Sequence, residues 1–155
     1  MAADHPNTPR PERLPRIAPE HMTEAQRKLA AEIAAGPRGE LRGPFIALMR
    51  SPELASPIQK VGEYLRYRCP LERRVAEMAT LIAARHWSQQ YEWNAHHEHA
   101  MKAGLNPAIA QAIAEGRRPA GMAGDEKIVY ALLTEALHNK SVCDATYAQA
   151  VAKFG

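Results

Sequence analysis

The sequence predicts an all-α fold. Apolar residues recur three or four positions apart in segment after segment, and helix-starting and helix-ending residues separate those segments. No stretch shows the alternation of β-branched and polar residues that is typical of strands. With 155 residues, 46% of them hydrophobic and 24% charged, the chain can bury one substantial core. We therefore predict one helical domain of about seven helices over residues 20–155, with a central antiparallel helix hairpin.

Residues 1–19 differ from the rest of the chain in composition. They hold five of the twelve prolines, several charged residues and no apolar run of signal-peptide length. We expect an extended or disordered arm there. No segment elsewhere reaches the roughly 18 apolar residues that a membrane span needs, so the sequence predicts a cytoplasmic protein with no membrane partner.

Three helical segments are predicted before residue 70. Thr23 and Gln26 form a capping box at the start of the first segment, and a Gly-Pro pair ends it. Residues 45–49 form one or two buried turns after a loop, and Pro52 or Ser56-Pro57 opens a longer helix. The apolar residues at helical spacing in the first and third segments are Leu29, Ala30, Ile33, Ile58, Val61 and Leu65.

The central helix is predicted over residues 71–85, which are apolar on nearly every side after the first turn. One carboxylate, Glu77, stands within that run. Ser88 is a capping residue for the next helix, which runs to about Ala103 before Gly104. Further helices are predicted from Asn106-Pro107 onward, over 125–138 and over 144–154.

Polar side chains lie on the face of the 88–103 helix that packing would bury. Glu92 and His96 are four residues apart and can touch across one turn. A hairpin with its turn around residues 86–88 brings Glu77 beside them. A carboxylate favours the protonated imidazole and burial opposes it, so Glu77, Glu92 and His96 form a candidate acid/base cluster. The same spacing fits a structural hydrogen bond equally well, with Glu77 paired to a nearby arginine.

A metal site is an alternative for the same helix. Glu92, His96 and His99 project within about 60° of one another, and carboxylates and imidazoles are ligands for zinc or iron. The two histidines are three residues apart and do not form the HExxH arrangement. We therefore predict no metal and keep this set of three as the alternative.

The cysteine count and the charge balance exclude other classes of protein. Cys69 and Cys143 are far apart in the sequence, so neither a CxxC redox pair nor a cysteine-rich zinc site can form from neighbouring residues. Twenty Lys and Arg against 17 Asp and Glu give a net charge of +3 without a dominant positive field. The basic residues are not interleaved with aromatic ones, so we predict no nucleic-acid partner.

Four stretches of the chain carry a family resemblance. They are Gly43-Pro44-Phe45 through Ser51-Pro52-Glu53-Leu54, Leu81-Ile82-Ala83-Ala84-Arg85-His86-Trp87, Gln90-Tyr91-Glu92-Trp93 with His96, and Lys102-Ala103-Gly104-Leu105. Over about residues 12–150 the sequence resembles the carboxymuconolactone decarboxylase-like family of the AhpD-like superfamily. The resemblance implies an all-α fold, an active site at the helix hairpin, and homotrimers or hexamers built from trimers.

The resemblance also distinguishes between the two activities found in the superfamily, peroxidase and decarboxylase. In the peroxidase branch, the glutamate and histidine of the motif fall on Glu77 and His96, and its two cysteines fall on Gln89 and Glu92. Both redox thiols are thus missing, which argues against a dithiol peroxidase. In the decarboxylase branch, which needs no cofactor, Glu92 with His96 resembles the retained acid/base arrangement.

We therefore expect a cofactor-independent lyase that acts on a small carboxylated lactone or a related product of aromatic degradation. Glu92 and His96 would be the proton-transfer pair, and Glu77 would tune or relay. Substrate binding is assigned to Arg85, which would hold a carboxylate, and to the aromatic residues Tyr91 and Trp93. The alternatives are a ligand-binding or assembly module without chemistry, and a metal-dependent enzyme.

Overall fold

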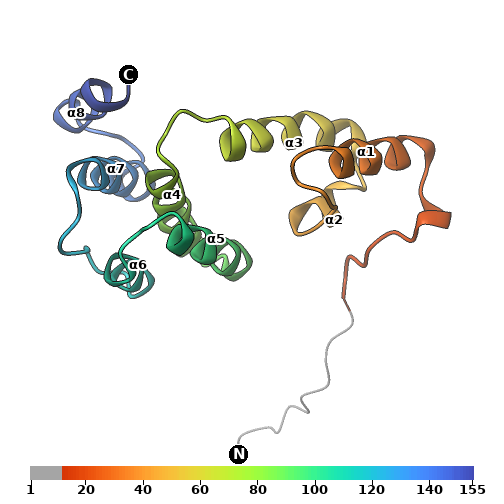
Figure 1. The fold of residues 1–155 in the computed structure, drawn as a ribbon, viewed down its shortest axis with the longest axis horizontal. Coiled ribbons are helices and arrows are strands. Elements are labelled where there is room, and N and C mark those ends of the chain that lie inside the picture. The colour runs from red at the N-terminus through yellow and green to blue at the C-terminus, as the bar shows by residue number, and fades with distance from the viewer. Residues whose placement is uncertain (1–11) are drawn as a thin grey trace, which may run out of the picture. The chain divides into compact units, whose positions relative to one another are not determined.

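A computed structural model describes residues 12–155 of the chain (Figure 1). Within that range the protein consists of eight α-helices, one short 3-10 helix and one π-helical turn, with no strand. The predicted all-α fold is therefore confirmed. The helices group into two compact units, one ending at Cys69 and the other covering Pro70–Gly155. Among the residues described, no helix combines the length and the apolar character that crossing a membrane requires.

The elements of the first unit are η1 (Pro19–His21), α1 (Glu24–Ala35), α2 (Pro44–Leu48) and α3 (Pro52–Tyr67). Helices α1 and α2 both pack against α3. The predicted capping box is present at the start of α1, where the Thr23 hydroxyl accepts from the Gln26 amide and the Gln26 side chain accepts from the Thr23 amide. The core of the unit consists of Leu29, Ile33, Phe45, Met49 and Ala55.

The predicted N-terminal arm is held against this unit over the part that the structure describes. Residues 1–11 lie outside the described range, and residues 12–18 are not helical. Arg50 donates a hydrogen bond to the Pro15 carbonyl oxygen at 2.8 Å, and Arg16 donates one to the Leu41 carbonyl oxygen at 2.9 Å. Ile17 packs against the core of the unit. Side-chain contacts thus fix the end of the arm.

The apolar stripe of α3 is not buried. Leu54, Ile58, Val61 and Leu65, which we call the α3 stripe, share one face, and the side chains of Val61 and Leu65 are 60% and 56% exposed. The buried residues of α3 are instead Ala55 and Gln59. Helical spacing correctly predicts that these residues share a face, but it does not determine whether that face is covered.

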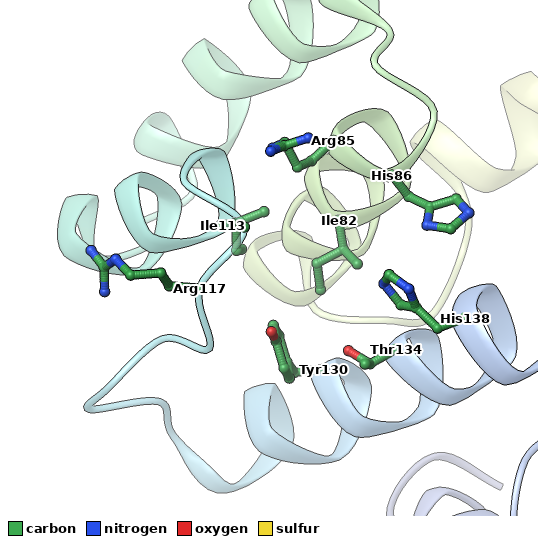
Figure 2. Close-up of a pocket in the computed structure, with 9 residues that line it drawn as sticks. Ile82, Arg85, His86, Ile113, Arg117, Tyr130, Thr134 and His138 are labelled. Atoms are coloured by element: carbon green, nitrogen blue, oxygen red, sulfur yellow. The ribbon is translucent and has the colours of Figure 1, made fainter.

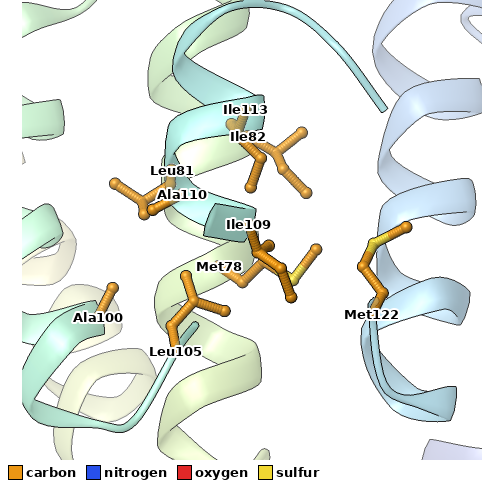
Figure 3. Close-up of a cluster of buried hydrophobic side chains, with 9 residues drawn as sticks. All are labelled: Met78, Leu81, Ile82, Ala100, Leu105, Ile109, Ala110, Ile113 and Met122. Atoms are coloured by element: carbon orange, nitrogen blue, oxygen red, sulfur yellow. The ribbon is translucent and has the colours of Figure 1, made fainter. Parts of the chain in front are cut away.

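The second unit is organised around α4. Its elements are α4 (Arg73–His86), α5 (Gln90–Lys102), α6 (Pro107–Ala114), α7 (Gly124–Thr134), η2 (Glu135–Asn139), which is the π-helical turn, and α8 (Asp144–Phe154). Helices α5, α6 and α7 all pack against α4, which is buried as its apolar sequence predicts. Figure 3 shows the core between them: Met78, Leu81, Ile82, Ala100, Leu105, Ile109, Ala110, Ile113 and Met122.

Three helices of this unit end in the same way. A residue with positive φ follows each helix, at Ser88 (52°), Gly104 (85°) and Gly116 (71°). The next amide then bonds back to a carbonyl five residues earlier, as from Gln89 to Ala84 at 2.8 Å. Ser88 was predicted to cap α5. It instead ends α4, and Gln89 stands at the α5 cap position without a side-chain hydrogen bond.

An ion network fixes α4 against the start of α7. The Arg74 guanidinium donates to the Asp125 carboxylate at 2.7 Å and also pairs with the buried Glu126. Glu126 in turn accepts from the Ala123 amide at 2.7 Å. Burial raises the pKa of Asp125, but hydrogen bonds from the Glu126 amide and Arg74 outweigh it and hold the pKa below its ordinary value. These bonds set the position of α7 relative to α4.

Candidate functional site

The α4–α5 hairpin brings the predicted acid/base residues together. Only residues 87–89 connect the two helices, so α5 must run back along α4. Glu77 lies ten residues before Trp87 and His96 lies nine after it, which places them at the same level of the hairpin. The Nδ1 atom of His96 is 2.6 Å from Oε2 of Glu77. The contact predicted from the sequence between these two residues is therefore present.

Glu77 is a buried carboxylate with two partners. Its side chain is 3% exposed, and its Oε1 atom lies 2.5 Å from the Arg73 guanidinium one turn earlier. Burial raises the pKa of Glu77. The hydrogen bond from His96 and the positive charges of His96, Arg73 and His99 outweigh burial and lower the pKa below its ordinary value. Glu77 is therefore ionised at neutral pH.

The state of Glu77 determines the tautomer of His96. An ionised carboxylate can only accept hydrogen bonds, so Nδ1 of His96 carries the proton that Glu77 accepts. When the ring is neutral, Nε2 is therefore the basic nitrogen. Glu77 also fixes the orientation of the ring, as the carboxylate of a catalytic triad does for its histidine.

Glu92 lies on the open side of the same imidazole. Its Oε2 atom is 3.5 Å from Nε2 of His96, which is longer than an ordinary hydrogen bond. The Glu92 side chain is 37% exposed, whereas that of His96 is 18% exposed. The site can thus accept a proton at Nε2, stabilise the resulting imidazolium through Glu77 and exchange the proton with Glu92 or water.

Among the described residues, none of the three predicted substrate-binding residues is hydrogen-bonded to or stacked on Glu77, Glu92 or His96. Tyr91 is half exposed and lies about 140° around α5 from His96. Trp93 stacks on His97, with ring centroids 6.1 Å apart, and packs against the core of the unit. Arg85 follows Glu77 by eight residues, which is about 12 Å along α4 and about 80° around it. Its Nε donates to the Ala114 carbonyl oxygen at 2.7 Å.

The alternative metal set is not assembled. Among residues 12–155, no group of three or more histidine, cysteine, aspartate or glutamate side chains is arranged to hold a metal ion. The His96 and His99 rings meet edge to face with centroids 6.1 Å apart. Both cysteines are free thiols, and neither belongs to α4 or α5: Cys69 follows α3, and Cys143 precedes α8.

A cavity elsewhere in the second unit gathers residues that, apart from Arg85, the sequence did not assign to a site. It has a volume of about 240 Å³ and lies between α4, the end of α6, and α7 with η2 (Figure 2). Tyr130, Thr134 and His138 line it from α7 and η2. They follow one another at intervals of four residues, and this polar row within an apolar helix is the signal that could have revealed them. Arg85 and His86 line the α4 side.

Comparisons of the chain with protein-family models, with curated proteins and with solved structures found no match.

Proposed function

We propose that the protein is a cofactor-independent acid/base lyase of the carboxymuconolactone decarboxylase-like kind, acting on a small carboxylated lactone or a related product of aromatic degradation. The observation that supports this proposal best is the 2.6 Å contact between buried, ionised Glu77 and Nδ1 of His96. This contact leaves Nε2 as the group that gains and loses a proton, beside the partly exposed Glu92.

The proposed chemistry needs only a proton donor, and His96 protonated at Nε2 is such a donor. In a decarboxylation, the bond between the carboxylate carbon and its neighbour breaks, and carbon dioxide leaves. The electron pair stays on the neighbouring carbon and takes up a proton. His96, protonated at Nε2 and stabilised by Glu77, would deliver that proton and regain one from water through Glu92.

The cysteine positions support a lyase over a dithiol peroxidase. The family resemblance puts the two peroxidase thiols on Gln89 and Glu92, which carry an amide and a carboxylate. Thiol–disulfide chemistry needs a thiolate to attack, and neither side chain can supply one. The exposed Gln89 lies at the start of α5, and Glu92 faces His96.

An activity assay with three variants tests the proposal. The wild type is expected to consume carboxymuconolactone and release carbon dioxide. His96→Ala should lower kcat/KM by about 100-fold or more, and Glu92→Gln should also lower it, because general acid/base groups contribute about 10²–10⁴-fold. Glu98→Gln is the matched control, since Glu98 lies on the exposed face of the same helix and pairs with Lys102. Its activity should equal that of the wild type.

Two results would each overturn one part of the proposal, the first its named substrate and the second its site. No turnover of the lactone by the wild type excludes that substrate. Full activity of both His96→Ala and Glu92→Gln, in protein that remains folded by circular dichroism, excludes the proposed site. A ligand that binds without being converted would favour the binding-module alternative.

Self-association as a homotrimer or a hexamer belongs to the same proposal. The exposed α3 stripe supports it, because four large apolar side chains on one helix face are typical of a surface that binds another protein. The proposed location is the cytoplasm, and the two free thiols fit a reducing compartment.

A further inference from the structure

The cavity between α4, α6 and α7 has an apolar wall and a polar wall. Ile82 and Ile113 contribute aliphatic surface, and Tyr130 and Thr134 contribute hydroxyl groups. Figure 2 shows Tyr130, Thr134 and His138 projecting toward α4, with His138 facing His86. At about 240 Å³ the cavity is below the roughly 300–1,000 Å³ typical of drug-sized ligands, so it suits a molecule with a single small ring.

The charge that lines this cavity is positive. Two arginines contribute this charge, two histidines add imidazole groups without a fixed charge, and none of the described lining residues is acidic. Arg117 has a carboxylate partner, because its Nε donates to Glu115 at 2.6 Å. For Arg85 the structure describes only the bond from Nε to the Ala114 carbonyl oxygen, with no ion pair among residues 12–155. That bond fixes the guanidinium plane and leaves its positive charge without a counter-ion.

The two histidines of the lining contact each other. The rings of His86 and His138 meet edge to face, with centroids 4.9 Å apart. Burial and the positive charges of His138 and Lys140 lower the pKa of His86 below its ordinary value. His138 is presented by the π-helical turn η2, a rare conformation that occurs frequently at functional sites. Because a π-helical turn holds more residues than an α-helical one, the His138 side chain points in another direction than it would if α7 continued as an α-helix.

We propose that this cavity is a binding site for a small organic anion, a carboxylate carried on an apolar or aromatic ring. Arg85 and the His86–His138 pair would bind the carboxylate, since a guanidinium is a strong donor to it and a neutral imidazole can donate through its one N–H group. Tyr130 and Thr134 would donate further hydrogen bonds, and Ile82 with Ile113 would contact the ring.

The proposed anion site is separate from the acid/base site. His86 follows Glu77 by nine residues, which places the two on opposite sides of α4. Arg85, the other α4 residue proposed to bind the carboxylate, lies about 12 Å along the helix from Glu77, and the described lining of the cavity contains none of Glu77, Glu92 and His96. The anion site therefore stands whether or not the protein is a lyase, and the two can be tested independently.

Benzoate is the probe for this site, with benzamide as its neutral analogue of the same shape. We expect saturable binding of benzoate by calorimetry, together with shifts of the His86 and His138 ring signals in NMR spectra. Benzamide should bind at least tenfold more weakly, because it lacks the charge. Arg85→Gln and His138→Gln should each weaken benzoate binding by about tenfold or more, as expected for a lost charge-assisted hydrogen bond.

Two control variants make the result specific. Arg42→Gln removes an exposed arginine that pairs with Glu40 in the first unit, and it should bind benzoate as the wild type does. His96→Ala should also keep wild-type binding. The proposal is wrong if benzoate does not bind saturably, if benzamide binds as tightly, or if Arg85→Gln and His138→Gln both bind normally. Loss of binding in His96→Ala alone would assign benzoate to the acid/base site and equally overturn it.

Discussion

Two carboxylates flank the His96 imidazole, and their surroundings differ. Glu77 is buried, has an arginine partner and holds Nδ1 at 2.6 Å, so it stays ionised and fixed. Glu92 is partly exposed and lies 3.5 Å from Nε2, so it is free to exchange protons with water. Groups of the same type can thus take different roles because their environments differ. Glu77 orients the ring and stabilises its charge, and Glu92 connects it to solvent.

The lowered pKa of Glu77 predicts how stability depends on pH. Because the pKa is lower in the folded state, ionised Glu77 stabilises the fold above its unfolded-state pKa, near 4.5. This contribution is lost as the pH falls through the lower, folded-state pKa. The free energy of unfolding of the wild type should therefore decrease as the pH falls below about 5, and Glu77→Gln should show a smaller decrease. Urea unfolding at a series of pH values measures both curves.

At neutral pH the same variant should be less stable than the wild type. The amide removes the carboxylate charge that pairs with Arg73 and His96, which costs about 1–3 kcal/mol. Glu12→Gln, an exposed change in the non-helical segment before η1, should keep both the stability and the pH dependence of the wild type. An unchanged slope below pH 5 in Glu77→Gln would show that this carboxylate does not contribute as described.

At the scale of elements, the end of α4 carries an unfavourable backbone conformation. Ser88 has a φ of 52°, where a side chain costs about 1 kcal/mol relative to glycine. The equivalent positions after α5 and α6 are Gly104 and Gly116. Ser88→Gly should therefore stabilise the protein by about 0.5–1 kcal/mol in urea unfolding. Ser88→Ala, which keeps the Cβ atom, should give no gain, and an equal gain from both variants would contradict this explanation.

Local sequence signals predicted helix boundaries correctly where a single residue type determines where the helix starts. The capping box at Thr23 and the Asn106-Pro107 start are both present, because a side chain bonds the backbone within the same turn. The helix over 144–154 is also as predicted. Ser88 was assigned to the wrong helix because serine is common before a helix and rare after one. The π-helical turn at residues 135–139 has no local sequence signal.

The candidate site was predictable only where the hairpin determines it. A short turn pairs residues equally distant from its centre, which is why Glu77 could be placed beside His96 from the sequence. The bond from Arg85 to the Ala114 carbonyl oxygen could not be predicted in this way, because it depends on how α6 packs against α4 and the hairpin does not determine that packing. The pairing of His86 with His138 depends on how α7 packs on α4, which the Arg74 ion network fixes. No short sequence pattern encodes a contact of that kind.

At the scale of the whole molecule, the α3 stripe is the apolar surface that we expect a partner to cover. An apolar stripe at helical spacing normally faces a core, yet these side chains are 40–60% exposed. Association with a second copy would remove this apolar surface from water, which is worth about 25 cal/mol per Å² before the cost of association is subtracted. The stripe is therefore the part of the first unit where a change should alter the oligomeric state.

The proposed self-association predicts a mass three or six times that of the 17.1 kDa chain in analytical ultracentrifugation. Val61→Glu should shift the protein toward the monomer, because it puts a charge in the centre of the α3 stripe. Lys60→Gln is the matched control, since it changes the net charge by the same amount at the neighbouring exposed position, outside the stripe. It should keep the wild-type mass. A monomeric wild type would refute self-association, and a normal oligomer in Val61→Glu would mean that another surface forms it.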